Sequence, residues 1–293
     1  MGLPGLAVVT GANTGLGLAS TTALAAAGWA VTLAVRSVEK GDLATTLVRA
    51  TVPDARLEVR RLDLADLTSV REFAAGWDAP LSLLMNNAGM MLVPQRTVTG
   101  EGLEEHMGVN HLGHYLLTAL LLPQLARAQG RVVSLSSIAH RSVDRLDRGL
   151  GLTGAYTPMG AYGQSKLATL MFAIELDRRL RQAAIGVKAV AAHPGWSATD
   201  PRAPGDRGDD PSPTVWLSRK ISQLLGSSAA DGARPQVYAG TAPELPGGSY
   251  CGPRWMIYGR PHLAAPSKAA RNVDDARWLF DASADLTGAP LLS

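Results

Sequence analysis

The sequence predicts one doubly wound α/β domain over residues 1–293, with a mostly parallel sheet of seven strands. Short apolar segments alternate with longer helical patterns, which is typical of strand–helix–strand units. The strand segments are apolar throughout instead of alternating with polar residues, as expected where helices cover both faces of a sheet. No linker-like stretch divides the chain, and 46% of its residues are hydrophobic, enough for one continuous core.

The expected elements follow one another without a repeat of solenoid length. Strands are expected at residues 6–10, 30–35, 57–62, 81–86, 131–135, 187–192 and 248–251. Helices are expected at residues 14–27, 38–50, 67–77, 104–122 and 161–180. Gly28 ends the first helix and Pro53 stops the second. Pro123 breaks the most apolar stretch, residues 115–126, which is also too short to span a bilayer.

The character of the chain changes after Pro194. Residues 200–213 are rich in Pro, Gly and Asp, so a loop is expected there, followed by a short amphipathic helix that begins near Val215. A loop and an apolar helix directly after the sixth strand suggest a substrate lid at 200–226. The alternative is a surface helix that packs on the core.

Composition excludes several classes of protein. The formal net charge is +3 and the basic residues are scattered, whereas nucleic-acid binding would be marked by a basic stripe. The single cysteine, Cys251, excludes an intramolecular disulfide and fits a reducing compartment as a buried thiol. The N-terminal residues lack the pattern of a signal peptide. We therefore expect a cytoplasmic protein without a membrane anchor.

A glycine-rich turn joins the first strand to the first helix. Glycines there let the backbone turn tightly and approach a pyrophosphate, which the free N–H groups of the helix N-terminus attract. In this strand–turn–helix position the motif predicts a Rossmann-type dinucleotide site. The expected cofactor contacts in this turn are Gly11, Asn13, Thr14, Gly15, Leu16 and Gly17.

The end of the second strand distinguishes NADP from NAD. A carboxylate there would bind the ribose hydroxyls of NAD and repel a 2′-phosphate, but the strand ends in Arg36, with Lys40 one turn further on. A guanidinium offers a bidentate contact to phosphate. We therefore expect NADP(H). Further contacts are expected where the third and fourth strands end, at Asp63, Leu64, Asn87, Ala88 and Gly89, although Asp63 could instead be a helix cap.

Tyr162 and Lys166 lie four residues apart on an expected helix and therefore share one face. An adjacent ammonium and an oxidised nicotinamide would both stabilise the phenolate and so lower the tyrosine pKa. Such a tyrosine can give a proton to a carbonyl oxygen or take one from an alcohol. The pair thus predicts acid/base chemistry at a carbonyl or alcohol group.

Four further motifs precede or follow this pair along the chain, and their order and spacing are informative. They are Asn86-Asn87-Ala88-Gly89, Asn110 within Gly-Val-Asn-His-Leu-Gly at 108–113, Ser136-Ser137 and Pro194-Gly195 with Thr199. Together with the glycine turn they resemble the short-chain dehydrogenase/reductase family over residues 6–199. The resemblance implies that Tyr162 is the acid/base and that Lys166 lowers its pKa and holds the nicotinamide ribose.

The same resemblance implies roles for the neighbouring motifs. Ser137, rather than Ser136, would hydrogen-bond the substrate oxygen, and Asn110 would hold a water that links Lys166 to solvent. Pro194, Gly195 and Thr199 would clamp the nicotinamide carboxamide.

Ser137 and Tyr162 are 25 residues apart, more than in many family members. With the segments at 108–118 and 131–141, this spacing resembles the retinol dehydrogenase and protochlorophyllide reductase-like branch. The resemblance implies that the substrate is a lipophilic carbonyl compound or alcohol, a small molecule of medium size for that class. Reduction of an activated carbon–carbon double bond is an alternative, and an NADP-sensing protein without turnover is another. The family often forms homodimers or homotetramers through the helices expected at 104–122 and 161–180, and the sequence leaves both states open.

Other residues that attract attention receive plainer interpretations. His106, His111 and His114 lack metal-ligand spacing, so they are expected to pack in the core or cap helices, and no metal is expected. Met85 is expected in the core. An apolar substrate pocket could be lined by Met90, Met91, Tyr156, Trp196 and Trp216.

Overall fold

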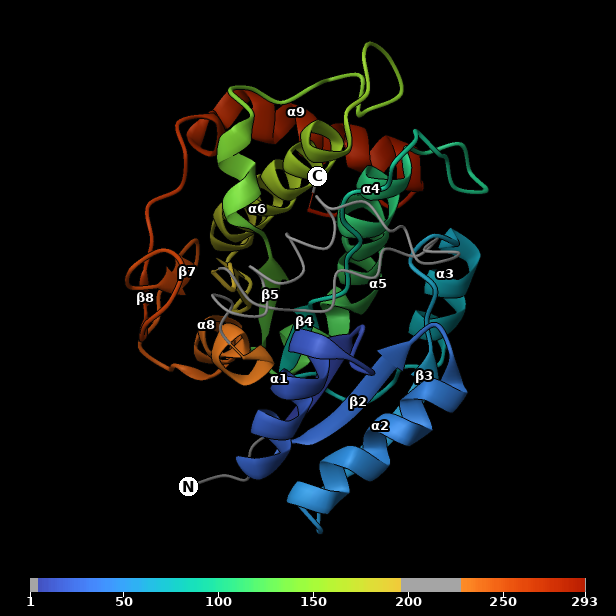
Figure 1. Ribbon diagram of the computed structural model, residues 1–293, viewed down its shortest axis with the longest axis vertical. Helices are drawn as coiled ribbons and strands as arrows, with labels where there is room; N and C mark the ends of the chain where they lie inside the picture. The colour runs from blue at the N-terminus through green and yellow to red at the C-terminus, as the bar shows by residue number, and fades with distance from the viewer. Residues whose placement is uncertain (1–4, 196–227, 293) are drawn as a thin grey trace, which may run out of the picture.

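A computed structural model describes residues 5–195 and 228–292, and within these ranges eight strands form one sheet (Figure 1). The strands are β1 Leu6–Thr10, β2 Ala30–Val35, β3 Leu57–Arg61, β4 Leu83–Asn86, β5 Arg131–Leu135, β6 Lys188–Ala192, β7 Tyr250–Pro253 and β8 Pro261–Leu263. Their order across the sheet is β3-β2-β1-β4-β5-β6-β7-β8. All neighbours pair in parallel except β7 and β8. Because β1 pairs with both β2 and β4, the strand order reverses there, and ligands bind at such switch points.

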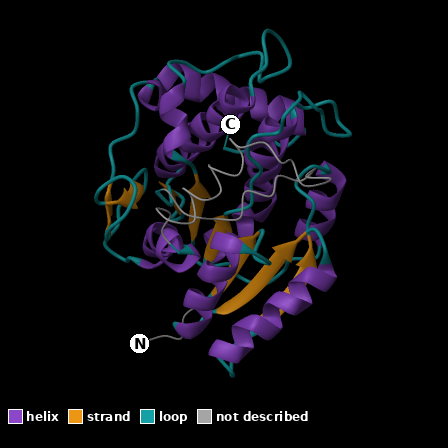
Figure 2. Cartoon of the chain, in the orientation of Figure 1, coloured by secondary structure: helices purple, strands orange, loops and turns teal. Residues whose placement is uncertain are grey.

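Helices cover both faces of this sheet (Figure 2). Those in the described ranges are α1 Gly15–Ala26, α2 Val38–Thr51, α3 Leu67–Ala75, α4 Glu105–Met107, the π-helix η1 Gly108–Leu112, α5 Gly113–Arg127, the 3₁₀ turn η2 Ile138–Ser142, α6 Pro158–Gln182, α8 Ala229–Thr241, the 3₁₀ turn η3 Ala269–Arg271 and α9 Val273–Thr287. Successive residues of β1 point to opposite faces. Ala7 and Val9 pack with α1, α2 and α8, whereas Val8 packs with α3, α5 and α6. This two-sided burial confirms the doubly wound fold predicted from the apolar strands.

The sheet differs from the prediction at one edge. It has eight strands in the described ranges instead of seven, because the chain turns back after β7 and pairs β8 antiparallel to it. The seventh strand is Tyr250–Pro253, two residues later than expected. Gly248 has a φ of +75°, which lies outside the extended region, so the strand cannot begin there.

The helix expected at 104–122 is three elements, α4, η1 and α5. At the junction of η1 and α5, a Cβ on Gly113 would lie 2.5 Å from the carbonyl oxygen of Leu64, so the helix packs unusually close to the turn after β3. The helix also continues through Pro123 to Arg127. Pro123 is exposed, so its missing N–H falls on the solvent side, where it disturbs packing least. π-Helical segments often accompany functional sites, and this one carries Asn110.

A further helix, α9, packs across α5 and α6 (Figure 1). It begins at Asn272, whose side chain accepts hydrogen bonds from the N–H groups of Asp274 and Asp275. It buries Phe280 against Tyr115 and Phe172, with ring centroids 5.4 and 5.9 Å apart. Surface of α5 and α6 is therefore covered by a helix of the same chain, and a homodimer or homotetramer formed through these helices stays a prediction. None of the described helices has the length and apolar character needed to cross a membrane.

Candidate active site

The glycine turn between β1 and α1 forms a tight cradle. Gly11 and Gly15 have φ values of +63° and +52°, in the left-handed region that favours glycine. A Cβ on Gly17 would lie 2.3 Å from the carbonyl oxygen of Gly11 and 2.6 Å from Nδ2 of Asn87, so a side chain would fill the cradle. The N-cap of α1 is Thr14, whose side chain makes no capping hydrogen bond, and the first turn has no acidic residue. Its N–H groups are thus available to an anion, which fits a dinucleotide pyrophosphate.

The turn after β4 is tied to this cradle by Thr10. The Thr10 hydroxyl oxygen accepts from the N–H groups of Asn87 and Ala88, each at 2.9 Å, and lies 2.9 Å from Nε2 of His114. Nδ1 of His114 lies 3.1 Å from the carbonyl oxygen of Asn110, so this nitrogen donates and Nε2 accepts the Thr10 proton. Burial lowers the pKa of His114 to about 4, which keeps the ring neutral for this arrangement.

The side chain of Asn110 is fully engaged by protein groups. Its Oδ1 accepts from the N–H of Met90 at 2.8 Å, and its Nδ2 donates to the Met90 carbonyl at 3.0 Å and to Oγ of Ser165 at 2.8 Å. A Cβ on Gly89 would lie 3.0 Å from Oδ1 of Asn110 and 3.2 Å from Nζ of Lys166. Asn110 therefore holds the turn after β4 against α6. The water-holding role that the resemblance implies stays a prediction.

The two serines after β5 have different partners. Ser136 is buried and donates its hydroxyl proton to the carbonyl oxygen of Lys166 at 2.7 Å. Ser137 is half-buried and its Oγ accepts from the N–H of Ala139 at 3.2 Å, and its side chain lies close enough to Tyr162 to lower the pKa of that phenol. The structure therefore brings Ser137, and not Ser136, to the tyrosine, in line with the order of preference drawn from the sequence.

Lys166 lies beneath Tyr162 on the same face of α6. Its Nζ is 5.9 Å from the centroid of the Tyr162 ring and donates to the carbonyl oxygen of Leu135 at 2.8 Å. Burial lowers the pKa of Lys166 to about 8, because its surroundings solvate the ammonium poorly. The pairing of the two side chains predicted from their four-residue spacing is present.

In the protein alone, the pKa of Tyr162 is shifted upward. The lowering that we predicted combines the ammonium of Lys166 with an oxidised nicotinamide and stays a prediction for the cofactor-bound state; without cofactor, burial raises the pKa of Tyr162, and the Ser137 side chain offsets this only in part. The residue is half-buried, and partial desolvation disfavours the phenolate. The prediction counted the nearby charge and had no access to burial.

The residues expected to bind the adenosine half of a cofactor lie where β2 and β3 end. Arg36 and Lys40 are exposed, and the N–H of Lys40 donates to Oγ of Ser37, the N-cap of α2. Asp63 is half-buried and its Oδ1 accepts from the N–H of Ala65 at 3.1 Å. The cap of α3 is Asp66, so Asp63 is not the helix cap that was its alternative interpretation. Leu64 is buried.

Comparison with known proteins agrees with this geometry. The family model described as short chain dehydrogenase matches residues 5–208. The chain belongs to the short-chain dehydrogenase family. It is 38% identical to human retinol dehydrogenase 11 over 296 residues, which cover 99% of this chain and 88% of that protein. It is 40% identical to mouse polyprenol dehydrogenase over 301 residues, which cover 97% of this chain and 84% of that protein. The resemblance to the retinol dehydrogenase-like branch is thereby confirmed.

Solved structures of short-chain dehydrogenases have the same fold. An uncharacterized protein from Mycobacterium paratuberculosis superposes with a TM-score of 0.81 at 38% identity, covering 99% of this chain and 97% of that one. An NADPH-bound short chain oxidoreductase from Pseudomonas aeruginosa superposes with a TM-score of 0.64 at 24% identity, covering 84% of this chain and 94% of that one. At 24% identity, the similarity to the Pseudomonas aeruginosa protein shows only that the two chains share a fold.

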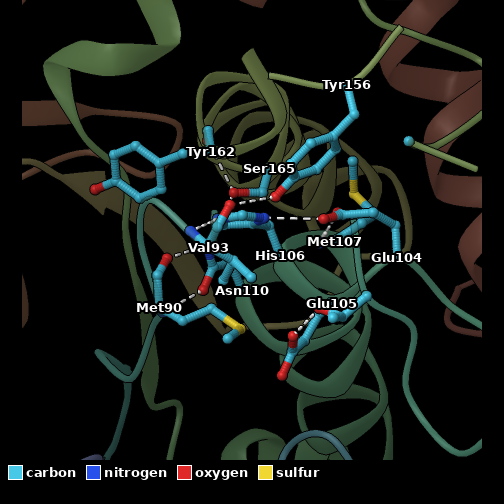
Figure 3. Close-up of polar contacts among 12 residues, drawn as sticks. Met90, Val93, Glu104, Glu105, His106, Met107, Asn110, Tyr156, Tyr162 and Ser165 are labelled. Atoms are coloured by element: carbon cyan, nitrogen blue, oxygen red, sulfur yellow. Dashed lines mark hydrogen bonds and ion pairs between the residues drawn. The ribbon is translucent and has the colours of Figure 1, made fainter. Parts of the chain in front are cut away.

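In this short-chain dehydrogenase, residues 90–93 lie beside Tyr162 and are held at both ends (Figure 3). Asn110 holds Met90, as described above. At the other end the hydroxyl of Tyr156 donates to the carbonyl oxygen of Val93 at 2.7 Å, and the N–H of Val93 donates to Nε2 of His106 at 3.3 Å. Of the predicted pocket residues, Met90 is buried, Tyr156 is half-buried and Met91 is exposed. The predicted place of these residues in a substrate pocket stays a prediction.

His106, which contacts Val93, also forms a buried pair with Glu104. Because Nε2 of His106 accepts from Val93, its Nδ1 carries the proton and donates to Oε1 of Glu104 at 2.9 Å. Glu104 also accepts from the N–H of Met107, and a Cβ on Gly151 would lie 2.8 Å from its Cγ. The long segment between Ser137 and Tyr162 thus packs on the Glu104–His106 pair through Gly151, close to the candidate site.

The other histidines and methionines match their plainer interpretations. His111 is buried, with Nε2 2.8 Å from Oγ of Ser283 on α9. Met85 lies in the core, and Cys251 is a buried free thiol. Within residues 5–195 and 228–292, no group of three or more His, Cys, Asp or Glu side chains is placed to hold a metal ion.

The last predicted motif is described only in part. Pro194 and Gly195 follow β6 directly, and Gly195 has a φ of +75°. Thr199, Trp196, Trp216 and the predicted lid at 200–226 lie outside the described residues.

Three residues of the site were missed by sequence reasoning. Thr10 was placed at the junction of the first strand and the glycine turn without a role of its own, and His114 was assigned to packing or capping. Gln236 of α8 was not considered, yet its Nε2 donates to Oδ1 of Asn87 at 3.0 Å and to Oγ of Ser20. No local pattern marks Gln236, because its partners are far away along the chain.

Proposed function

We propose that this short-chain dehydrogenase is an NADP(H)-dependent oxidoreductase that transfers a hydride to or from a medium-sized apolar carbonyl or alcohol. The observation that carries the proposal is the convergence of Tyr162, Ser137 and Lys166 beside a glycine cradle that excludes side chains. The relatives named as retinol and polyprenol dehydrogenases support a lipophilic alcohol or its carbonyl product as the substrate. A cytoplasmic location is part of the proposal and rests on the single cysteine.

The residues of the cradle fit such a cofactor. The first-turn N–H groups of α1 would hold the pyrophosphate, Arg36 the 2′-phosphate, and Lys166 the nicotinamide ribose. The bound nicotinamide supplies or accepts the hydride. Of the proposed contacts, Asn87 and Ala88 are fixed by Thr10, so they present a preorganised surface to the ligand.

Tyr162 would exchange the proton that balances hydride transfer. In the reductive direction its hydroxyl donates to the carbonyl oxygen as negative charge develops there, and in the oxidative direction its phenolate accepts the alcohol proton. Ser137, whose side chain already influences the pKa of Tyr162, would donate to the same substrate oxygen. The ammonium of Lys166, 5.9 Å from the ring centroid, would stabilise the phenolate left after proton donation.

A screen of aldehydes, ketones and enones, followed through the absorbance of NADPH, tests the reaction. We expect turnover of apolar aldehydes or ketones, with little reduction of the carbon–carbon double bond of the enones. Turnover confined to double bonds would replace the carbonyl proposal with the alternative reductase. Tight NADPH binding without turnover of any of the three classes would point to the sensing protein.

Replacing Arg36 by alanine tests the cofactor preference. Because a charge-assisted hydrogen bond contributes about 1.5–3 kcal/mol, the Kd for NADPH should rise about tenfold or more, while the Kd for NADH stays unchanged. Isothermal titration of both cofactors measures this. The matched control is Arg49→Ala, an exposed arginine further along α2, which should leave both constants unchanged. Equal or tighter binding of NADH by the unaltered protein would refute the NADP assignment.

A further inference from the structure

The turn between β7 and β8, residues 254–260, exposes an apolar cluster to solvent. All seven of its residues are exposed. The exposed fractions of Trp255, Met256, Ile257 and Tyr258 lie between 45% and 63%. Four adjacent large apolar side chains in solvent are unusual for a surface turn, because contiguous exposed apolar patches generally mark interaction sites. We call these residues the β7–β8 turn.

The β7–β8 turn lies at the edge of the sheet that carries the site. β7 runs parallel to β6, so the chain leaves β7 at the carboxyl ends of the strands, where ligands of such sheets bind (Figure 1). A Cβ on Gly195 would lie 2.4 Å from the carbonyl oxygen of Ile257 and 2.7 Å from Cγ of Pro253. The turn therefore packs directly on Gly195, which follows β6 and was predicted to contact the nicotinamide.

The charge around the turn has one sign. Residues 245–273 include four basic residues and no aspartate or glutamate, and the basic ones are Arg254, Arg260, Lys268 and Arg271. Arg254 and Arg260 flank the apolar cluster, and the guanidinium of Arg254 lies 5.4 Å from the Trp255 ring centroid. Tryptophan and tyrosine prefer the interface of a bilayer, and flanking cations are attracted to anionic headgroups.

We propose that the β7–β8 turn docks this protein reversibly on the surface of an anionic lipid bilayer. The chemistry of the turn fits this partner, since its aromatic side chains can enter the headgroup region while Arg254 and Arg260 contact lipid phosphates. The inference deepens the proposed function and rests on it in one respect: a lipophilic substrate partitions into bilayers, so a site beside a docking surface would receive it there. A second copy of the chain is the competing occupant, and the test separates the two.

Sedimentation of the full chain with vesicles tests the proposal. We expect binding to phosphatidylcholine vesicles that contain phosphatidylserine, and binding on the order of tenfold weaker to pure phosphatidylcholine, with the difference reduced at high salt. The double variant Trp255→Ser with Tyr258→Ser should lose tenfold or more in affinity for both vesicles. The variant Arg254→Gln with Arg260→Gln should lose mainly the preference for anionic vesicles.

A matched control lies on α2, where Leu43 and Leu47 are 68% and 59% exposed. The variant Leu43→Ser with Leu47→Ser should bind vesicles as the unaltered protein does, and an equal loss there would overturn the assignment to the β7–β8 turn. Absence of binding to anionic vesicles would also overturn it, as would self-association that disappears in the Trp255 and Tyr258 variant. Sedimentation is done without cofactor or substrate, and reduction of a water-soluble aldehyde is measured separately. A failure of the redox proposal would therefore leave the vesicle result valid. Likewise, a failure to bind vesicles would leave the redox proposal valid.

Discussion

Replacing Tyr162 by phenylalanine is expected to lower kcat by about 10²–10⁴-fold, the range typical of a lost general acid or base. The substitution removes the hydroxyl and leaves the ring in its half-buried position over Lys166. The Kd for NADPH should therefore stay unchanged, because the ring still fills its place. Steady-state kinetics with an apolar aldehyde, together with titration of NADPH, measure both quantities.

The pH dependence provides a second readout of the same variant. Burial raises the pKa of Tyr162, so its phenolate, the form that accepts a proton from an alcohol, becomes more populated as the pH rises through the alkaline range. Alcohol oxidation by the unaltered protein should therefore accelerate with pH, and this rise should be absent from the residual rate of Tyr162→Phe.

Tyr156→Phe is the matched control for Tyr162→Phe. Tyr156 lies in the same region, but its hydroxyl donates to the carbonyl oxygen of Val93. Its loss should loosen residues 90–93, raising KM while kcat changes by only a few fold. Full activity of Tyr162→Phe, or an equal loss of kcat in Tyr156→Phe, would contradict the role given to Tyr162.

Replacing Phe280 by alanine should destabilise the protein by about 3–5 kcal/mol, as is usual when a buried phenylalanine is truncated. Phe280 is 1% exposed, and its ring contacts Tyr115 and Phe172. The guanidinium of Arg179 lies 4.2 Å from its centroid. The loss would leave a cavity between α9 and the two helices beneath it. Urea unfolding followed by circular dichroism gives the free energy of unfolding.

Trp278→Ala on the same helix is the control. Trp278 is half-buried, and its ring lies 5.2 Å from the guanidinium of Arg148. Truncation there should reduce the free energy of unfolding by about 1 kcal/mol, since less apolar surface is exposed and no closed cavity forms. A loss under 1 kcal/mol in Phe280→Ala would show that α9 does not pack on α5 and α6 as described.

Much of the fold could be predicted because its signals are local. The strands before residue 195 lie within two residues of their expected bounds, since a continuous apolar run between turn residues leaves little choice. The helix at 104–122 was placed but wrongly drawn as one helix. Its π-helical part ends where Gly113 approaches Leu64, a contact between distant segments that the local sequence does not show.

The C-terminal part was predicted least well. α9 carries recognisable signals, namely Asn272 before two aspartates and Gly288 in a left-handed conformation at its end. β8 carries none, because a three-residue strand at a sheet edge is held only by its pairing with β7. β8 forms because the turn after β7 folds the chain back so that residues 261–263 can pair with β7.

The candidate site divides in the same way. The glycine turn, the spacing of Tyr162 and Lys166, and the order of the neighbouring motifs are properties of the sequence. The structural consequence of the spacing follows from local backbone geometry, since residues four apart on a helix share a face. The sequence by itself therefore determined the family, the cradle and the reacting pair.

Only the tertiary structure decided how these groups behave. It set the raised pKa of Tyr162, and it joined Thr10 to Asn87 and His106 to Val93. It also brought the β7–β8 turn beside Gly195. The physical reason is common to all of these. Desolvation and hydrogen bonding depend on which atoms surround a group, and those atoms come from segments that only the folded chain brings together.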